Sequence, residues 1–173
     1  MITGTITKGQ PKVTDIIPIN RSENELLKFA YSLEKMSEHP LAKAIVEKAN
    51  EAEISPIEIT DFKALSGNGV SGKLDDKTIL GGSLKFINEQ ISVSENTIKL
   101  CENLAENGKT PSLFSIENEL SGIIAVADVV KDDSPKAIKE LQNMGIKVIM
   151  LTGDNEKTAN AIGKTVGVDE VIA

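Results

Sequence analysis

Aromatic residues and cysteines are nearly missing from this 173-residue sequence, which has no Trp, one Tyr, four Phe and one Cys. With so few rings available, we expect a core built mainly from Ile, Leu, Val and Ala. The single cysteine, Cys101, excludes an internal disulfide and a cysteine-based metal site, and it fits a reducing compartment. No apolar run approaches the roughly 20 residues of a membrane-spanning helix, and the N-terminus lacks a signal-peptide pattern.

Positive charge is also in deficit, because 26 acidic residues face 19 basic ones and the net charge is −7. Such a surface repels nucleic acid and anionic lipid, so we expect neither as a partner. An anionic ligand such as ATP would need a local site made by lysines, backbone N–H groups or Mg²⁺.

The first two thirds of the chain change between helical and strand patterns. Ser22 and Glu25 form a capping box ahead of an amphipathic helix expected to end near Lys35, and Pro40 suits the start of a second helix. From Ile57 the apolar period changes to two, which predicts strands. The remaining expected elements are a hairpin of 70–74 with 77–80, helices from 83 and over 94–107, and strands over 112–116 and 120–126.

The last third predicts a different layer. A helix over 134–145, a buried strand over 147–152, a helix over 156–166 and a strand at 171–172 form the pattern of a parallel α/β layer with crossover helices. The segment Thr3–Lys12 reads as a loop. We therefore predict an α/β protein in which a mixed antiparallel sheet with flanking helices, residues 15–122, is inserted into an incomplete parallel α/β domain formed by residues 1–14 and 123–173.

Four short motifs, in this order, carry a family resemblance: Thr3–Gly9 (TGTITKG), Ser37–Leu41 (SEHPL), Asp128–Lys131 (DVVK) and Thr152–Asp154 (TGD). They resemble the phosphorylation-motif tail, the Ser-Glu-His-Pro-Leu signature, the hinge and the Thr-Gly-Asp motif of heavy-metal P-type ATPases, of the copper type. The resemblance covers essentially the whole chain. It implies a nucleotide-binding domain inserted into part of a haloacid-dehalogenase-like phosphorylation domain, as the cytoplasmic part of an integral membrane pump.

The departures from the family motifs concern the reaction itself. Met1 and Ile2 stand where the family has the phosphorylated Asp and a Lys, and the Gly-Asp-Gly-x-x-Asn-Asp motif is absent. We therefore expect a fragment that binds ATP without forming the phosphoenzyme. The resemblance assigns Thr5 and Thr152 as hydroxyl donors to the phosphate and places Asp154 near the nucleotide and Mg²⁺.

The resemblance also assigns residues to the ATP pocket: Glu34, Glu38, His39, Gly67, Gly69, Val70 and Gly81. Taken alone, His39 reads as a surface or helix-start imidazole, Glu34 as an exposed charge at a helix end, and the Gly67–Gly69 stretch as a plain turn. A dinucleotide-binding loop is excluded there because a hairpin follows rather than a long helix. Gly82 replaces an Asn that is frequent in the family. Gly108-Lys109-Thr110 is either a phosphate contact or a turn.

Other functions stay open at this point. A soluble haloacid-dehalogenase-like phosphatase with a cap domain shares the α/β core, a non-catalytic nucleotide sensor would need only the pocket, and a zinc or cadmium pump shares the cytoplasmic motifs. ATP and the remaining domains of the same pump are the expected partners. The edge of the short parallel sheet near Val171 also makes a fragment dimer by strand exchange an expectation.

Overall fold

The computed structural model describes residues 5–65, 69–152 and 156–173. Its body is a six-stranded antiparallel sheet in the order β1-β6-β5-β4-β3-β2, and a second sheet pairs β7 with β8 in parallel. The strands are β1 (Thr7–Pro18), β2 (Thr60–Leu65), β3 (Gly69–Leu74), β4 (Lys77–Gly82), β5 (Thr110–Ile116), β6 (Glu119–Val130), β7 (Ile149–Leu151) and β8 (Glu170–Ile172). The helices are α1 (Glu23–Glu34), α2 (Pro40–Glu51), α3 (Leu84–Gln90), α4 (Glu95–Glu106), α5 (Ser134–Asn143) and α6 (Glu156–Val166).

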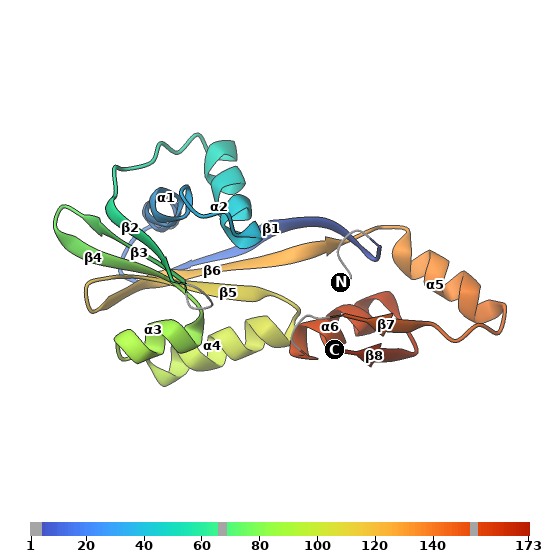
Figure 1. Cartoon of the computed structure of the whole chain (residues 1–173). Helices are drawn as coiled ribbons and strands as arrows, with labels where there is room; N and C mark the ends of the chain where they lie inside the picture. Colours follow the sequence, from blue (N-terminus) through green and yellow to red (C-terminus); the bar gives the residue numbers. More distant parts are fainter. Residues whose placement is uncertain (1–4, 66–68, 153–155) are drawn as a thin grey trace.

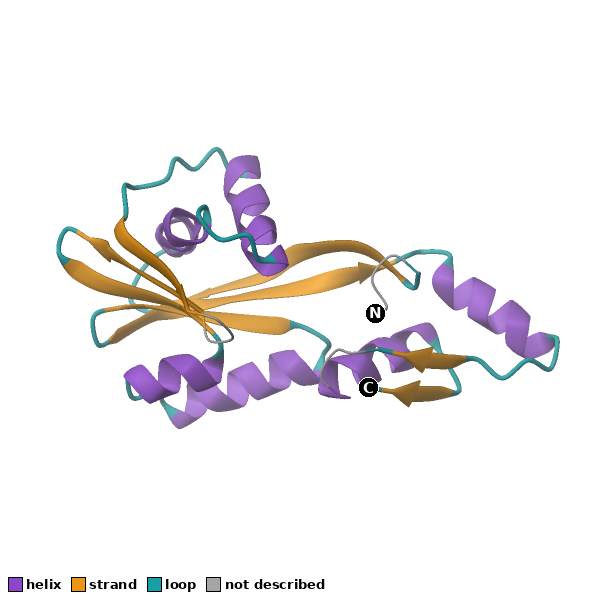
Figure 2. Ribbon diagram, in the orientation of Figure 1, coloured by secondary structure: helices purple, strands orange, loops and turns teal. Residues whose placement is uncertain are grey.

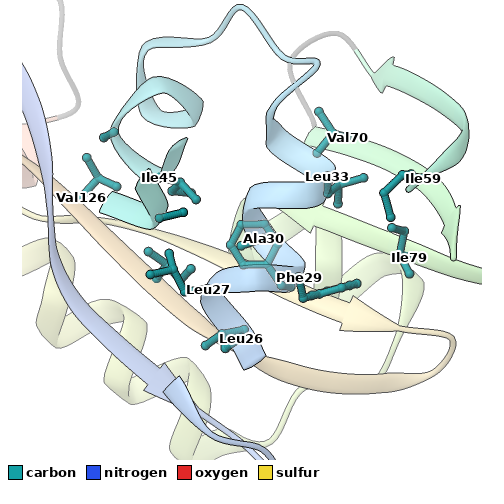
Figure 3. Packing of buried hydrophobic residues seen from close by; sticks show 14 residues of the cluster. Leu26, Leu27, Phe29, Ala30, Leu33, Ile45, Ile59, Val70, Ile79 and Val126 are labelled. Atoms are coloured by element: carbon teal, nitrogen blue, oxygen red, sulfur yellow. The ribbon is translucent and has the colours of Figure 1, made fainter. Parts of the chain in front are cut away.

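Two helices cover each face of the large sheet, with α1 and α2 on one side and α3 and α4 on the other (Figure 1). Successive residues of β5 show the alternation, because Phe114 joins the core under α1 and Leu113 joins the core under α3 and α4. The α1 side is mostly aliphatic, and its one aromatic pair, Phe29 and Phe114, meets edge to face with ring centroids 6.4 Å apart. Figure 3 shows how the buried side of α1 fills this core.

The last third of the chain forms a separate small layer beyond one end of the large sheet (Figure 2). Helix α6 covers one side of the β7–β8 pair, where Met150, Ala159, Ile162 and Val166 are buried together with Ile138 of α5. The mixed antiparallel sheet with flanking helices and the parallel strands at the C-terminal end agree with the predicted α/β fold class.

The N-terminal segment differs from the prediction, because most of the expected loop Thr3–Lys12 belongs to β1. This strand is an edge strand, so its Pro11 removes no ladder hydrogen bond that the sheet needs. A register shift lies between Thr7 and Pro11, and the Asp128 carboxylate closes it by accepting from Thr7 Oγ1 at 2.6 Å and from the Gln10 N–H at 3.2 Å. The Thr- and Gly-rich composition therefore marks a bulged strand rather than a loop.

β1 and β6 run together as a long antiparallel ribbon that links the large sheet to the small layer (Figure 1). The predicted domain boundaries at Thr14 and Ile123 fall inside these two strands. The division into 1–14, 15–122 and 123–173 thus stays a prediction, and the two parts are joined by continuous strands.

Local sequence signals correctly predict several elements. The Ser22 hydroxyl accepts from the Glu25 N–H at 3.3 Å while the Glu25 carboxylate accepts from the Ser22 N–H at 2.8 Å, as the capping box predicts. Asp75 and Asp76 have φ of 48° and 66° and turn the β3–β4 hairpin, which suits a primed turn. The strand expected from Ile57 begins only at Thr60, because the Ile57 N–H donates to Ser32 Oγ at 2.8 Å instead of to a neighbouring strand.

Candidate nucleotide pocket

A cavity of about 450 Å³ opens on the α1–α2 side of the large sheet. One side of the cavity is formed by the corner between α1 and α2, and the other side by the neighbouring ends of β2, β3, β4 and β5. The described lining residues are Glu34, Ser37, Glu38, His39, Leu41, Ala42, Ala64, Leu65, Gly69, Val70, Gly82, Ser83, Thr110, Pro111 and Ser112. The site therefore joins segments that are up to about half the chain apart in sequence.

Glycines make one wall of the cavity from bare backbone. Gly69 of β3 pairs with Gly82 of β4, and both line the cavity. A Cβ on Gly69 would lie 2.1 Å from the Gly81 carbonyl oxygen, so no larger residue fits there without a shift of the strands. Because Gly69 and Gly82 have no side chains, a flat ligand can lie on the main chain at this wall.

Glu34 is the buried polar group of the site. It ends α1, its side chain lines the cavity, and only 8% of the residue is exposed. Burial raises the pKa of its carboxyl to about 7, against a smaller lowering by a hydrogen bond from the Ser37 side chain. The interpretation of Glu34 as an exposed charge at a helix end is therefore wrong. The spacing of Leu26, Ala30 and Glu34, four residues apart, places Glu34 on the same face of α1 as two buried apolar residues.

His39 lies at the start of α2, as the following proline predicts. Its Nδ1 accepts from the Leu41 N–H at 3.2 Å, so the imidazole is the N-cap of the helix. This bond orients a ring that lines the cavity, and it uses Nδ1 rather than Nε2. Glu38, its exposed neighbour, also lines the cavity.

Three hydroxyl residues also line the cavity: Thr110, which the sequence analysis named as a possible phosphate contact, and Ser83 and Ser112, which it did not name. Ser83 caps α3 by accepting from the Phe86 N–H at 3.2 Å. The β4–β5 register pairs Gly82 with Leu113, which brings Ser83 next to Ser112. Only this register reveals them, since no local motif connects positions 83 and 112.

The structure does not bring every predicted pocket residue to the cavity. Gly81 is not among the described lining residues, and a Cβ there would meet the Phe114 ring at 2.8 Å and Leu33 at 3.1 Å, so it is a packing position under α1. Gly67 lies outside the described residues. Lys109 also does not face the pocket freely, because its Nζ donates to the Asp15 carboxylate at 2.7 Å.

The predicted phosphate-side residues lie at the small layer. Thr5 is exposed just before β1, and Thr152 is buried just after β7. Ile6 packs against the cluster that contains Met150, so the two threonine segments approach the same core. Asp154 lies outside the described residues.

The described residues contain no preformed cluster of metal ligands. Across 5–65, 69–152 and 156–173, no three His, Cys, Asp or Glu side chains group as metal ligands. In the same ranges, no helix has the length and hydropathy that crossing a bilayer requires.

The sequence pattern of the haloacid dehalogenase-like hydrolases matches residues 2–173. The chain belongs to this family. Within the family, it is 44% identical over 173 residues to copper-transporting ATPase 1 of Rhizobium meliloti (strain 1021), covering 99% of the chain and 21% of the relative. Further relatives named copper-exporting P-type ATPases are 41–46% identical. The chain thus spans about a fifth of the length of the curated relatives it matches.

Solved structures place the fold in the same group. A zinc-transporting PIB-type ATPase in the E2.Pi state superposes with a TM-score of 0.83 and 34% identity over 97% of the chain and 27% of that structure. The catalytic domain of the CPx-ATPase CopB-B, studied upon nucleotide binding, has a TM-score of 0.71 and 31% identity over 99% of the chain and 58% of its own. The resemblance to heavy-metal P-type ATPases is confirmed.

Proposed function

We propose that the chain is the ATP-binding part of a heavy-metal-exporting P-type ATPase and that adenine occupies the cavity between the α1–α2 corner and β3–β5. The observation that carries the proposal is the buried Glu34 carboxyl, which lies in a cavity beside a bare glycine wall. Beyond its hydrogen bond with the Ser37 side chain, the Glu34 carboxyl has capacity for further hydrogen bonds, and a purine offers both a flat face and a polar edge to this site.

The dimensions and the lining of the cavity support this ligand class. A volume of about 450 Å³ falls within the range of small-molecule sites, which are mostly apolar with few polar groups. Leu41, Ala42, Val70 and Pro111 supply apolar contacts for a ring. His39, fixed as the N-cap of α2, supplies an imidazole at the rim.

We expect this chain to bind ATP, and the reaction itself to need a carboxylate nucleophile that attacks the γ-phosphate. Thr5, Thr152 and Asp154 remain the proposed phosphate-side residues. ATP affinity should be modest, on the order of 0.1–1 mM, because a base pocket alone contributes roughly 4–5.5 kcal/mol.

For the whole protein we propose a membrane pump of which this chain is a cytoplasmic part. Copper is favoured as the ion, because the relatives at 41–46% identity are named for copper. A zinc or cadmium pump is the second candidate, since a zinc-transporting ATPase shares the fold at 34% identity. Copper- and zinc-stimulated ATPase activity of the full-length pump would separate the two.

We also propose that the isolated chain self-associates through its small sheet. Met150 faces α6 and is 3% exposed, whereas Leu151 is 69% exposed. Ile149 and Ile172 are exposed on the same two strands. Parallel sheets are normally covered on both faces, so this apolar face and the strand edge favour pairing with a second copy.

Calorimetric titration of the 173-residue chain with ATP tests the pocket. Ser112→Phe should weaken binding more than tenfold, because Ser112 is 8% exposed and its side chain lines the cavity that the ring would fill. Thr78→Phe is the matched control, because Thr78 is an exposed residue of β4 outside this cavity. If the wild-type chain fails to bind ATP, or if Ser112→Phe binds as well as Thr78→Phe, the pocket assignment is wrong.

A further inference from the structure

The Glu34 carboxyl is buried without a positive partner. The ion pairs of the described residues all lie elsewhere, and none reaches Glu34. No lysine or arginine is among the described residues that line the cavity. The Ser37 hydroxyl is its hydrogen-bond partner, and burial raises the pKa of the carboxyl to about 7. A carboxyl in such surroundings keeps its proton more readily than one beside a cation.

The other titratable groups around Glu34 do not reverse this preference. From the α1–α2 corner, Glu38 adds a second negative charge, Lys35 is exposed, and His39 uses its Nδ1 to accept from the Leu41 N–H. Among the described residues, the segments of β2, β3, β4 and β5 that line the cavity contribute only Ala, Leu, Gly, Val, Ser, Thr and Pro. The strand side therefore brings no charge to the carboxyl.

The two protonation states of a carboxyl recognise different purines. A neutral acid offers one acceptor oxygen and one O–H donor side by side, and this pair is complementary to the N6 amino group and the N1 lone pair of adenine. A carboxylate offers two acceptors, which suit the adjacent N1–H and N2 amino donors of guanine but oppose the N1 lone pair of adenine. The protonation state thus decides which base edge the residue fits.

We propose that Glu34 reads adenine as a neutral carboxylic acid, donating its proton to N1 and accepting a hydrogen bond from the N6 amino group, and that this selects adenine over guanine. The inference rests on the proposed function, because it assumes that a purine enters the cavity. It gives the ATP site a built-in dependence on pH, in which occupancy falls as Glu34 ionises.

The size of the effect follows from the fraction of protonated Glu34. With a pKa of about 7, this fraction falls about tenfold between pH 6 and pH 8, and the apparent affinity of a ligand that needs the acid falls by the same factor. Guanine nucleosides should change in the opposite direction. Glutamine keeps the acceptor and the donor of the acid but does not titrate, so Glu34→Gln should bind adenine at both pH values.

The test is an NMR titration of the 173-residue chain with adenosine and with guanosine at pH 6 and pH 8. Nucleosides are used because the terminal phosphate of ATP titrates in the same range, as phosphate monoesters do near about pH 6. The variants are Glu34→Gln and, as a matched control, Glu47→Gln, an exposed residue of α2 outside the cavity. Circular dichroism of each variant verifies the fold.

The expected result is adenosine binding that weakens about tenfold from pH 6 to pH 8 in the wild type and in Glu47→Gln, with Glu34→Gln nearly independent of pH. Adenosine and ATP that bind equally at both pH values would overturn the inference and leave the proposed function standing. A pH dependence that persists in Glu34→Gln would assign the titration to another group and also overturn the inference. Absence of any nucleoside or ATP binding would contradict the proposed function itself.

Discussion

Replacing Glu34 by glutamine should stabilise the fold at alkaline pH. In the unfolded chain the carboxyl has a pKa of 4.5, and in the folded protein burial raises it to about 7. The folded state therefore binds more protons than the unfolded state between these two pH values. The contribution of Glu34 to the free energy of unfolding is fully present below about pH 4.5 and is lost as the pH rises through about 7. A shift of this size corresponds to about 3 kcal/mol.

Glutamine has nearly the shape of the neutral acid and carries no charge at any pH. The Glu34→Gln chain should therefore match the wild type near pH 4.5 and exceed it at pH 8 by an amount approaching about 3 kcal/mol. Most single substitutions destabilise by about 0.5–3 kcal/mol, so a gain from one atom exchange would be specific to this mechanism.

The measurement is urea unfolding followed by far-UV circular dichroism at pH 5, 6, 7 and 8, with the difference between variant and wild type plotted against pH. The difference removes the contributions of all other titrating groups, which the two chains share. Glu47→Gln, at an exposed position of α2, should show a flat difference near zero. A constant difference for Glu34→Gln across the series, or a less stable variant at pH 8, would refute the interpretation of Glu34 as an unpaired buried acid.

Two further variants test other parts of the account. His39→Asn should weaken ATP binding about tenfold, or roughly 1.4 kcal/mol, as measured by calorimetry. Its free energy of unfolding in urea should stay within about 1 kcal/mol of the wild type, because asparagine is a good N-cap and replaces the Nδ1 acceptor. Unchanged ATP affinity would remove His39 from the site. Light scattering should show concentration-dependent dimers of the wild-type chain, and Leu151→Lys should abolish them, because Leu151 is 69% exposed on the small sheet. A wild-type chain that is monomeric at every concentration would exclude the association.

Local sequence signals predicted the elements that depend on a few neighbouring residues. The capping box of Ser22 and Glu25 and the paired Asp75–Asp76 turn each act within four residues, and both appear as predicted. The exception is Thr7–Lys12, where the partner that turns an apparent loop into a strand is Asp128, far along the chain.

The pocket was predictable only in part, for the same reason. Glu34, Glu38 and His39 belong to one short segment, so a motif could identify them together, and all three line the cavity. Ser83 and Ser112 reach it through the pairing of β4 with β5, which the sequence does not reveal. The family resemblance assigns Gly81 to the pocket, but at that position α1 approaches the sheet so closely that a Cβ would meet Phe114.

Chemical-shift mapping with ATP tests the central claim, that a purine binds at the α1–α2 corner, most directly. Amide spectra of the 173-residue chain should show saturable shifts in the segments that contain the lining residues of the cavity, which are 34–42, 64–65, 69–70, 82–83 and 110–112. In a second titration with adenosine, which has no phosphates, the amide signals of β7 and β8 should stay unchanged, because these strands lie outside the cavity. Shifts confined to other surfaces, or no saturable shifts at ATP concentrations of several millimolar, would contradict the assignment.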